Sequence, residues 1–317
     1  MLLIYSFLQI IYVVLLAPLV AGILAKVEER LESKQGPSIF QPYYDLIKLF
    51  KKESLVPKVA SPLFRIGPYV NLAFYLLLII ILPILTGFPL TFGPTADFIG
   101  GGLIFGASSI IKKISALDSR NNYSHLGTAR ASSIGALSDP IIVLIFILCG
   151  IISNTNNPYV INNIFQSSSS WFFSVVHFFI VIAFGMILII ETGKLPIESK
   201  TQLEFGMIDQ GMELEYSGTE LAIYKLGGYI KQFLLMSVFL NVFASPFFVP
   251  MEGAKFKDVL VYSIIHFVKI LILTIVFAII EETVSKYRLY KIFDYMAVVF
   301  VLTLLGIIAI YTTRGIF

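Results

Sequence analysis

Carboxylate side chains are concentrated in residues 191–220, a stretch we call the acidic segment. Carboxylates this close together raise one another's pKa, and burial raises it further, so some of them could hold or relay protons near neutral pH. The alternative interpretation is a solvated acidic surface that docks a basic partner subunit, and the two are compatible. The acidic residues of this segment are Glu191, Glu198, Glu204, Asp209, Glu213, Glu215 and Glu220.

The spacing of these carboxylates predicts which of them share a face of a helix. If residues 201–216 form a helix, Glu204 and Glu215 share one face, while Asp209 and Glu213 lie four residues apart on another. We therefore expect a helix with two acidic rows, and we regard these four residues, together with Glu191, as candidates for proton or ion coupling.

Ionisable side chains also occur within apolar segments. His266 and Lys269 lie three residues apart and so share a helix face, where a charge is costly unless it is paired or hydrated. Asp139 lies nearer the end of its segment, where a relay role and an interface role are both open. We expect these three residues to take part in coupling. For Lys112 and Lys113, snorkelling of the ammonium groups to the membrane surface is a sufficient explanation.

Residues 35–57 contain a second polar region, with the sequence QGPSIFQPYYDLIKLFKKESLVP. Gly36-Pro37 predicts a turn, and Gln41-Pro42 predicts the start of a short helix whose apolar residues recur at helical spacing. We expect an amphipathic helix at the membrane interface, in which Asp45 pairs with Lys48. The lysines at 48, 51 and 52 would meet anionic headgroups or an acidic partner surface.

The composition indicates that lipid surrounds most of the chain. Its 317 residues are 57% hydrophobic and 14% charged, which is too apolar for a soluble fold that must cover its own surface. The single cysteine, Cys149, excludes an internal disulfide, a Cys-ligated iron–sulfur cluster and a zinc ribbon. The net charge of +3 gives no support to nucleic-acid binding, and the first apolar segment has the features of a retained span rather than a signal peptide.

Hydropathy predicts an all-α polytopic membrane protein with about eight transmembrane helices and amphipathic cytoplasmic helices, forming a single integral membrane domain over residues 1–317. Each apolar segment is long enough to cross about 30 Å of hydrocarbon. The predicted spans lie near residues 2–25, 69–90, 97–115, 137–154, 171–191, 220–245, 257–280 and 293–313.

The distribution of basic residues fixes the topology. With eight spans, the loops at 26–68, 112–136, 192–219 and 281–292, with the flanking Lys225 and Lys231, hold 19 of the 23 Lys and Arg residues on one side. If the glycine-rich third segment did not cross, these basic loops would be split between two faces, against the positive-inside rule. We therefore expect a multi-pass protein of the cell membrane, with both termini outside and cytoplasmic loops at 26–68 and 192–219.

Motifs in these two loops resemble one membrane subunit shared by respiratory complex I and membrane-bound nickel–iron hydrogenases. The resemblance extends through Leu126-Gly127 and Arg130, and the hydropathy profile carries it over nearly the whole chain. The matching residues are Gly36-Pro37, Gln41-Pro42-Tyr43, Asp45, Lys48-Leu49, Lys52-Glu53, Glu191, Leu195-Pro196, Leu203-Glu204, Met207 and Leu214 to Gly218.

The compact forms QPYYDLIKL and LPIESKTQLE are closer to the hydrogenase branch of this family than to its quinone-reducing branch. Within the hydrogenase branch the resemblance includes membrane-bound hydrogenase and formate hydrogenlyase. Gln202 and Asp209-Gln210 stand where that branch often has His and His-Glu, and these departures leave room for a related sulfane-reducing complex.

The resemblance implies a subunit that joins a cytoplasmic redox arm to antiporter-like and small membrane subunits, without a metal centre or other cofactor of its own. Iron–sulfur clusters and a nickel–iron centre would then reside in partner subunits docked on the 26–68 and 192–219 loops. The residues expected to dock these partners are Gly36, Pro37, Gln41, Pro42, Asp45, Lys48, Lys52, Glu53 and Arg130.

Two other functions are considered. In the first, the chain forms the walls of a quinone pocket between the first span, the 35–57 helix and the acidic segment, as part of a complex I-type NADH or ferredoxin dehydrogenase. In the second, it is a stand-alone ion transporter. The sequence disfavours the transporter, because the two halves of the chain contain no inverted repeat and no pair of broken helices.

Overall fold

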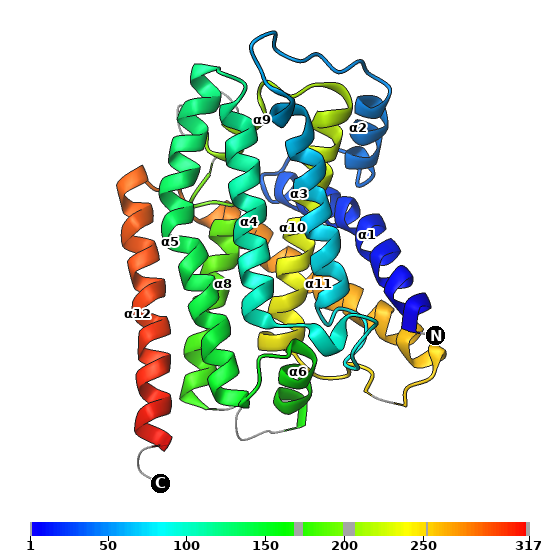
Figure 1. The fold of residues 1–317 in the computed structure, drawn as a ribbon, viewed down its shortest axis with the longest axis vertical. Coiled ribbons are helices and arrows are strands. Elements are labelled where there is room, and N and C mark those ends of the chain that lie inside the picture. The colour runs from blue at the N-terminus through cyan, green and yellow to red at the C-terminus, as the bar shows by residue number, and fades with distance from the viewer. Residues whose placement is uncertain (1, 168–173, 199–206, 252, 315–317) are drawn as a thin grey trace.

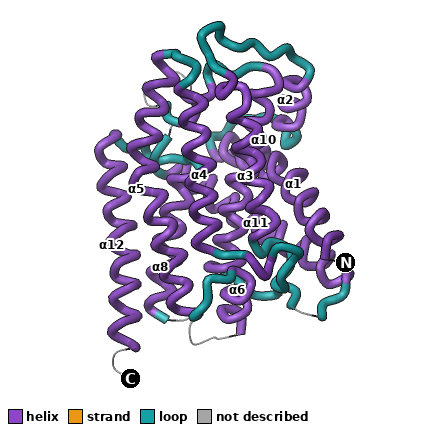
Figure 2. Tube along the Cα trace, viewed as in Figure 1, coloured by secondary structure: helices purple, strands orange, loops and turns teal. Residues whose placement is uncertain are grey.

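The computed structural model describes residues 2–167, 174–198, 207–251 and 253–314, and over these ranges the chain is helical with no strand. Figures 1 and 2 show the arrangement. The helices are α1 (Leu2–Leu31), α2 (Gln41–Phe50), α3 (Pro62–Ile81), η1 (Gly93–Thr95), α4 (Phe98–Leu117), α5 (Asn122–Ser153), α6 (Pro158–Ser167), α8 (Val175–Glu191), α9 (Asp209–Glu213), α10 (Gly218–Val238), η2 (Phe239–Ala244), α11 (Phe256–Thr283) and α12 (Leu289–Arg314).

Seven of the described helices are long and apolar enough to cross a membrane: α1, α3, α4, α5, α10 with its η2 extension, α11 and α12. The remaining predicted span, 171–191, corresponds to α8, which is equally apolar but only 17 residues long in its described part. The glycine-rich third segment is one uninterrupted helix of 20 residues, α4. The chain is therefore a multi-pass membrane protein, as expected from hydropathy.

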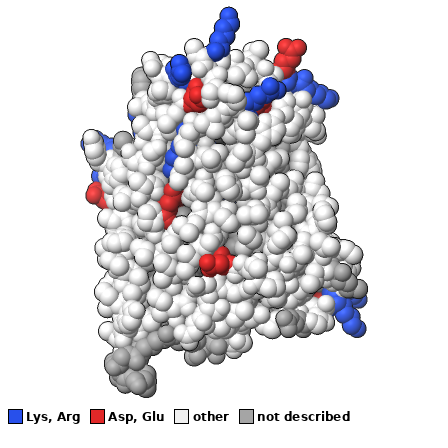
Figure 3. Space-filling view, in the orientation of Figure 1, with Lys and Arg blue, Asp and Glu red and all other residues white. Residues whose placement is uncertain are grey.

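The two ends of the bundle differ in character. The loop between α1 and α3, the turn between α4 and α5, and α9 lie at the upper end in Figure 1, whereas both chain termini lie toward the lower end. On the face in Figure 3, most of the Lys and Arg side chains gather at the upper end, and the middle is largely uncharged. This is the one-sided charge distribution that the loop count predicts.

The first loop, which we define as residues 32–61, is packed onto α1 by a glycine. A Cβ atom built at Gly22 would lie 2.0 Å from the carbonyl oxygen of Ile39, so only glycine permits this approach of the two backbones. Pro42, buried at the start of α2, lies against the same glycine. The Asp45 carboxylate accepts a hydrogen bond of 2.9 Å from Gln41 Nε2 rather than pairing with Lys48, so that expected ion pair is wrong.

Buried side-chain amides form hydrogen bonds with backbone groups at the end of α3 and in the irregular segment that follows it. Gln9 donates to the carbonyls of Ile79 and Leu82, and its side-chain oxygen accepts from the Leu85 N–H. From the opposite side, Asn241 in the π-helical η2 donates to the carbonyls that follow α3 at residues 83 and 84. These bonds replace the helical partners that the backbone has lost, as a low-dielectric interior requires.

The first loop and the end of the acidic segment are in direct contact. Ser217 accepts a hydrogen bond of 2.8 Å from the Leu55 N–H and donates one of 3.1 Å to the Leu55 carbonyl. The next residue, Gly218, has a φ of +54°, and a Cβ atom there would lie 2.6 Å from the carbonyl oxygen of Glu53. The two predicted docking loops therefore form one continuous surface.

This contact predicts a specific effect of replacing Gly218 with Ala. The methyl group meets the backbone of the first loop and also opposes the left-handed conformation, so we expect a loss of about 2–3 kcal/mol in stability. A lower melting temperature in detergent and faster proteolysis of residues 51–60 would report it. Gly228→Ala in the same helix is the matched control, because a Cβ there meets no atom within 4 Å. Equal melting temperatures for the two variants would contradict the prediction.

The expected helix over residues 201–216 is wrong in its described part. Only Asp209–Glu213 is helical, and the chain turns at Leu214 and Glu215. Tertiary contacts take precedence here: the Tyr216 ring stacks on Phe64 at 4.2 Å, and its hydroxyl donates to Ser115 Oγ at 3.0 Å. Residues 201–206, including Glu204, lie outside the described residues, so the proposed pairing of acidic rows has no support.

Candidate functional site: a charged cavity at the loop end of the bundle

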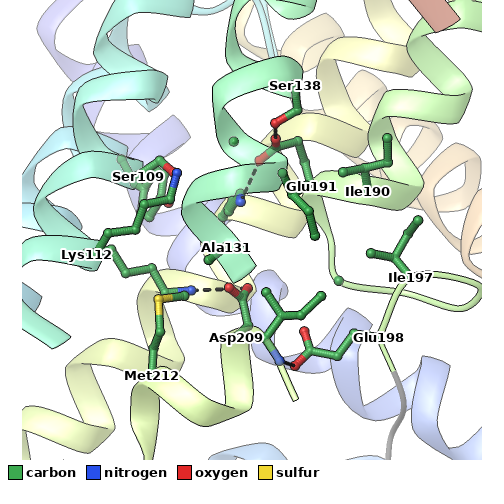
Figure 4. Close-up of a pocket in the computed structure, with 17 residues that line it drawn as sticks. Ser109, Lys112, Ala131, Ser138, Ile190, Glu191, Ile197, Glu198, Asp209 and Met212 are labelled. Carbon is green, nitrogen blue, oxygen red and sulfur yellow. Dashed lines mark hydrogen bonds and ion pairs between the residues drawn. The ribbon is translucent and has the colours of Figure 1, made fainter. Parts of the chain in front are cut away.

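A polar cavity of about 290 Å³ lies among α4, α8, α9 and α10, and a smaller one of about 50 Å³ adjoins it toward α5. Figure 4 shows the smaller one, into which side chains from α4, α5, α8 and the acidic segment project. We refer to the two together as the polar cavity. Its charged lining residues are Lys112, Lys113, Glu191, Glu198, Asp209, Glu213, Lys225 and Lys231.

Glu191 ends α8 and carries the most closely held ion pair of the cavity. Its carboxylate lies 2.8 Å from Lys231 Nζ on α10 and accepts a 2.6 Å hydrogen bond from Ser138 Oγ on α5. Only 7% of the Glu191 side chain and 13% of the Lys231 side chain are exposed. Charges buried to this degree are stable only as a pair, so each requires the other.

Two lysines of α4 make the remaining ion pairs. Lys112 Nζ lies 3.2 Å from Asp209 Oδ2 on α9, and Lys113 Nζ lies 4.0 Å from Asp139 Oδ2 on α5. Both lysine side chains are 13% exposed. The expectation that they snorkel to the membrane surface is therefore wrong. They point inward, because carboxylates inside the bundle offer them partners that lipid does not.

Glu198 positions α9 within the cavity. Its carboxylate accepts the backbone N–H groups of Ile208 and Gln210, at 2.8 and 3.1 Å, and so satisfies donors at the start of that short helix. The chain returns over α8 at Gly193, whose φ is +61° and where a Cβ atom would lie 3.2 Å from Glu198 Oε2. The turn and the carboxylate together bring Glu198 and Asp209 into the same space.

These neighbouring carboxyl groups titrate differently. Burial, with the nearby Asp209 charge, raises the pKa of Glu198 from 4.5 to about 7. Burial alone would also raise the pKa of Asp209, but the lysines around it, Lys112 first, hold that pKa below its usual value. Burial also raises the pKa of Glu213. At neutral pH the pair therefore combines an ionised carboxylate with one that exchanges its proton.

Replacing Glu198 with Gln is expected to remove one pH dependence of stability. Because the folded pKa exceeds the usual one, the folded chain binds more protons between pH 4.5 and 7, and stability falls as pH rises through that window. The loss should be on the order of 3 kcal/mol in the native chain and absent in Glu198→Gln, whose amide oxygen still accepts the two N–H groups. Melting temperatures at pH 5 and pH 7.5 measure it, with Glu53→Gln in the exposed first loop as control. A variant that keeps the native pH slope would contradict the assignment.

Several buried polar atoms around the cavity have no hydrogen-bond partner within the described chain. They include the Tyr224 hydroxyl, Gln232 Nε2 and Asp139 Oδ1. A buried group of this kind is costly unless water reaches it, and a space of about 290 Å³ has room for several water molecules. The cavity is therefore suited to hydrated ions or to protons that move along water between carboxylates.

The other predicted coupling carboxylates of the acidic segment are placed differently. Glu213 lines the larger part of the cavity, as Asp209 does. Glu215 does not line it, because its carboxylate accepts a hydrogen bond from the Asn121 side chain at the start of α5. Glu204 lies outside the described residues.

His266 and Lys269 lie on α11, away from the cavity lining. His266 is fully buried, and its Nδ1 lies 3.0 Å from the Tyr12 hydroxyl. Lys269 Nζ donates to the carbonyls of Ser245 and Phe247, at 2.9 and 2.7 Å, where the α10–η2 helix ends. The structure thus gives Lys269 a capping role that is sufficient to explain a cation inside the membrane.

Some of the predicted docking residues hold other parts of the chain in place, and others are exposed on the surface. Gln41 holds Asp45, while Arg130 Nη1 donates to the Met207 carbonyl at 3.3 Å and so holds the acidic segment against α5. Lys48 and Lys52 are exposed. The other predicted docking residues are Gly36 with a φ of +65°, Pro37, Pro42 and Glu53.

Sequence reasoning did not select Lys112, Lys231, Glu198 and Ser138 as site residues, although they hold the predicted carboxylates in place. Lys231 had a detectable signal: it was counted with Lys225 as flanking the 192–219 loop, but it lies well inside the predicted span 220–245, where a basic residue requires a buried partner. The partner itself, Glu191, comes from another helix, so no spacing along the chain connects the two.

Comparison with known proteins gives matches over most of the chain. The family model described as NADH dehydrogenase matches residues 3–312. Component C of hydrogenase-4 from Escherichia coli K12 is 27% identical over 294 residues, covering 90% of this chain and 89% of that protein. Subunit 4 of formate hydrogenlyase from the same organism is 28% identical over 290 residues, covering 90% and 91%.

Two further similarities extend this set. A subunit of the NADH-quinone oxidoreductase from Rhodospirillum rubrum is 25% identical over 273 residues, covering 83% of this chain and 78% of that protein. A chain in the structure of the membrane-bound sulfane sulfur reductase, an archaeal respiratory membrane complex, superposes with a TM-score of 0.84. It covers 97% of this chain and 99% of its own at 19% identity, so this likeness concerns the fold.

Proposed function

This chain belongs to the NADH dehydrogenase family, and we propose that it is a membrane subunit that links electron transfer in a docked redox arm to ion translocation. The redox arm would be of the hydrogenase type, as the name of one relative indicates, with the nickel–iron centre that the motif resemblance implies. The translocated ion would be a proton or sodium. The complex would lie in the cell membrane with the loop end of the bundle facing the cytoplasm. The chain would be a non-catalytic subunit of an oxidoreductase.

The observation that carries this proposal is the position of the polar cavity. At its upper side it borders α9 and the acidic segment, which are continuous with the exposed first loop through Ser217 and Gly218. At its other side it is lined by Lys113, whose Nζ lies 4.0 Å from Asp139, a residue of α5 whose side chain is 23% exposed. Figure 3 shows charged atoms of both signs over α4 and α5, well below the loop end. The charged network thus connects a docking surface with a membrane-facing side of the bundle.

Electrostatic coupling is the mechanism that this arrangement supports. A redox event in the docked arm would change the charge or position of the acidic segment. It would thereby change the protonation of Glu198, which lies beside Asp209. Lys112 and Lys231 border both the acidic segment and Glu191, so a change at one carboxylate alters the field at the other. Ion carriers alongside α4 and α5 would receive this change through Asp139.

Partners and cofactors form part of the same proposal. Iron–sulfur subunits and a large hydrogenase-like subunit would dock on the first loop and the acidic segment, where Lys48 and Lys52 are exposed. Their iron–sulfur clusters and nickel–iron centre would carry the electrons, and this chain would hold no cofactor. Small membrane subunits and antiporter-like subunits would cover the side between α4 and α5 where Asp139 lies, apart from the face that α5 shares with α12.

The polar cavity does not support a quinone pocket, the alternative function. No described residue of the first span or of the 35–57 helix, where that pocket is expected, lines the cavity. Pockets for organic ligands are also mostly apolar with a few polar groups, whereas this cavity is lined by charges of both signs. Electron transfer that depends on added quinone and stops with quinone-site inhibitors would support this alternative.

The proposal is tested by replacing Glu191 with Gln in the complete complex, reconstituted into liposomes. The amide keeps hydrogen bonds to Ser138 and Lys231 but cannot bind a proton. We expect ion translocation per electron transferred to fall several-fold in complexes that assemble and transfer electrons. Because Glu191→Gln also leaves the buried Lys231 charge without its partner, Glu191→Gln with Lys231→Met, in which no charge is stranded, is measured alongside it. Glu53→Gln is the control on the exposed loop. Unchanged translocation in Glu191→Gln would overturn the coupling role.

A further inference from the structure

An apolar groove between α5 and α12 lies outside the polar cavity. It has a volume of about 270 Å³ and is open on its outer side, where Leu137 and Phe300 are 44% and 41% exposed. Small side chains of both helices leave the space between the larger ones. The groove is lined by Ala136, Leu137, Pro140 and Ile141 of α5 and by Phe293, Met296, Ala297 and Phe300 of α12.

The dimensions of the groove fit one hydrocarbon chain. From Phe293 to Phe300 it runs along about 10 Å of helix. One leaflet of a bilayer contributes roughly 15 Å of hydrocarbon, so the groove covers a large part of one acyl tail. A transmembrane helix is about 10–12 Å across with its side chains and would not enter a space of this volume. A helix could only lie over the opening.

The groove ends at a collar suited to an anionic headgroup. Tyr290 lies three residues before Phe293 on the same helix face and is 83% exposed, as aromatic side chains at a membrane interface are. Arg288 and Lys291 are exposed in the first turn of α12 or just before it, and Asp294 is the acidic residue nearest to them along the helix. Two basic groups and a phenol beside an acyl-sized groove are the elements of a phospholipid site.

The nearby carboxylates at the end of α11 are engaged elsewhere. Glu281 is buried, 3.8 Å from Lys194 Nζ, and accepts a hydrogen bond from the Leu195 N–H. Glu282 is half-buried and lies near Lys34, whose pKa is raised first by Glu32 and least by Glu282. The charge at the mouth of the groove is therefore set by Arg288, Lys291 and Asp294, and it is positive.

We propose that the α5/α12 groove binds one acyl chain of an anionic phospholipid, whose phosphate is held by Arg288 and Lys291. The site belongs to the leaflet on the loop side of the bundle, because Phe293 lies near the start of α12. Ala136 is at the middle of α5, which extends beyond the start of α12 at that end of the bundle (Figure 1). A bound lipid there would be a structural component of the folded subunit rather than part of the surrounding bilayer.

The test uses the full chain in detergent with a phosphatidylglycerol that carries a photoactivatable group in its tail, followed by peptide mass spectrometry. We expect labelling of residues 136–141 and 293–300 that unlabelled phosphatidylglycerol competes away and phosphatidylcholine does not. Ala297→Phe and Ala136→Phe, which fill the groove from opposite walls, should abolish this labelling. Val298→Phe, at a neighbouring position 51% exposed, should leave it unchanged.

The headgroup is tested separately with Arg288→Gln and Lys291→Gln. Each should lower the preference for phosphatidylglycerol over phosphatidylcholine about fivefold, while Lys255→Gln and Lys257→Gln, at the start of α11, should not. Labelling that persists when the groove is filled, or that phosphatidylcholine competes equally, would overturn the proposal. Labelling that occurs in the isolated chain but is lost in the intact complex would assign the face to a partner subunit and overturn it as well.

Discussion

Replacing Lys231 with Met is expected to lower the free energy of unfolding of the chain by about 3–5 kcal/mol, because it leaves a buried carboxylate without its cation. Glu191 is 7% exposed, and Lys231 Nζ at 2.8 Å is its ion-pair partner, with Ser138 contributing one further hydrogen bond. The neutral side chain cannot compensate the charge, and the neighbouring Asp139 carboxylate adds repulsion. We expect little folded chain in membranes and a strongly lowered melting temperature in detergent.

A double replacement separates the loss of the pair from the loss of the lysine side chain. In Lys231→Met with Glu191→Gln no charge is stranded, so most of the stability should return, while ion translocation should stay as low as in Glu191→Gln alone. Lys225→Met, another lysine of α10 that lines the cavity, serves as the matched control. If Lys231→Met were as stable as the native chain, the ion pair between Lys231 and Glu191 would not stabilise the fold.

The spans and the two loop surfaces were predictable because they depend on local composition. An apolar run long enough to cross the hydrocarbon must form a helix there, since no other structure satisfies its backbone. The same reasoning identified α4 correctly despite its glycines, because the positive-inside rule requires it to cross. The motif resemblance is also confirmed, because the NADH dehydrogenase family model matches residues 3–312.

The contents of the cavity were only partly predictable, because they depend on contacts between helices. Glu191, Asp209, Glu213 and Asp139 were chosen as acidic groups near the membrane, and the structure places all four in or beside one network. Their partners come from α4 and α10, which sequence spacing cannot align with α8.

Glu215 was chosen because it lies in the acidic segment, but its carboxylate does not face the cavity. Its role in coupling stays a prediction. The chain turns after Glu213, so Glu215 meets Asn121 outside the cavity, and helical spacing no longer applies. Lys269 illustrates a related point: its rarity inside a span predicted a function, but capping two backbone carbonyls explains it as well. Whether His266 and Lys269 take part in coupling stays a prediction.

Asp139→Asn is expected to have the largest effect on ion movement of the variants considered, lowering translocation on the order of 100-fold. Asp139 is the only carboxylate within α4 and α5, and its side chain is 23% exposed. Inside the cavity, Glu191, Glu198 and Asp209 lie together, so the loss of one carboxylate is partly offset by the others. At the proposed exit on α5, the described residues of α4 and α5 offer no second carboxylate.

The amide should leave the fold intact, which makes the measurement specific. The ion pair with Lys113 is long, at 4.0 Å, and Asp139 Oδ1 has no hydrogen-bond partner within the described chain, so the amide should cost less stability than the loss of a charge from the 2.8 Å pair of Glu191 and Lys231. Ion uptake and electron transfer would be measured together in liposomes, with Asp139→Glu to restore the carboxyl group and Asp97→Asn, at the start of α4, as control. Because Asn can donate and accept hydrogen bonds but cannot release a proton, normal translocation in Asp139→Asn would place the exit elsewhere and break the link between the polar cavity and this side of the bundle.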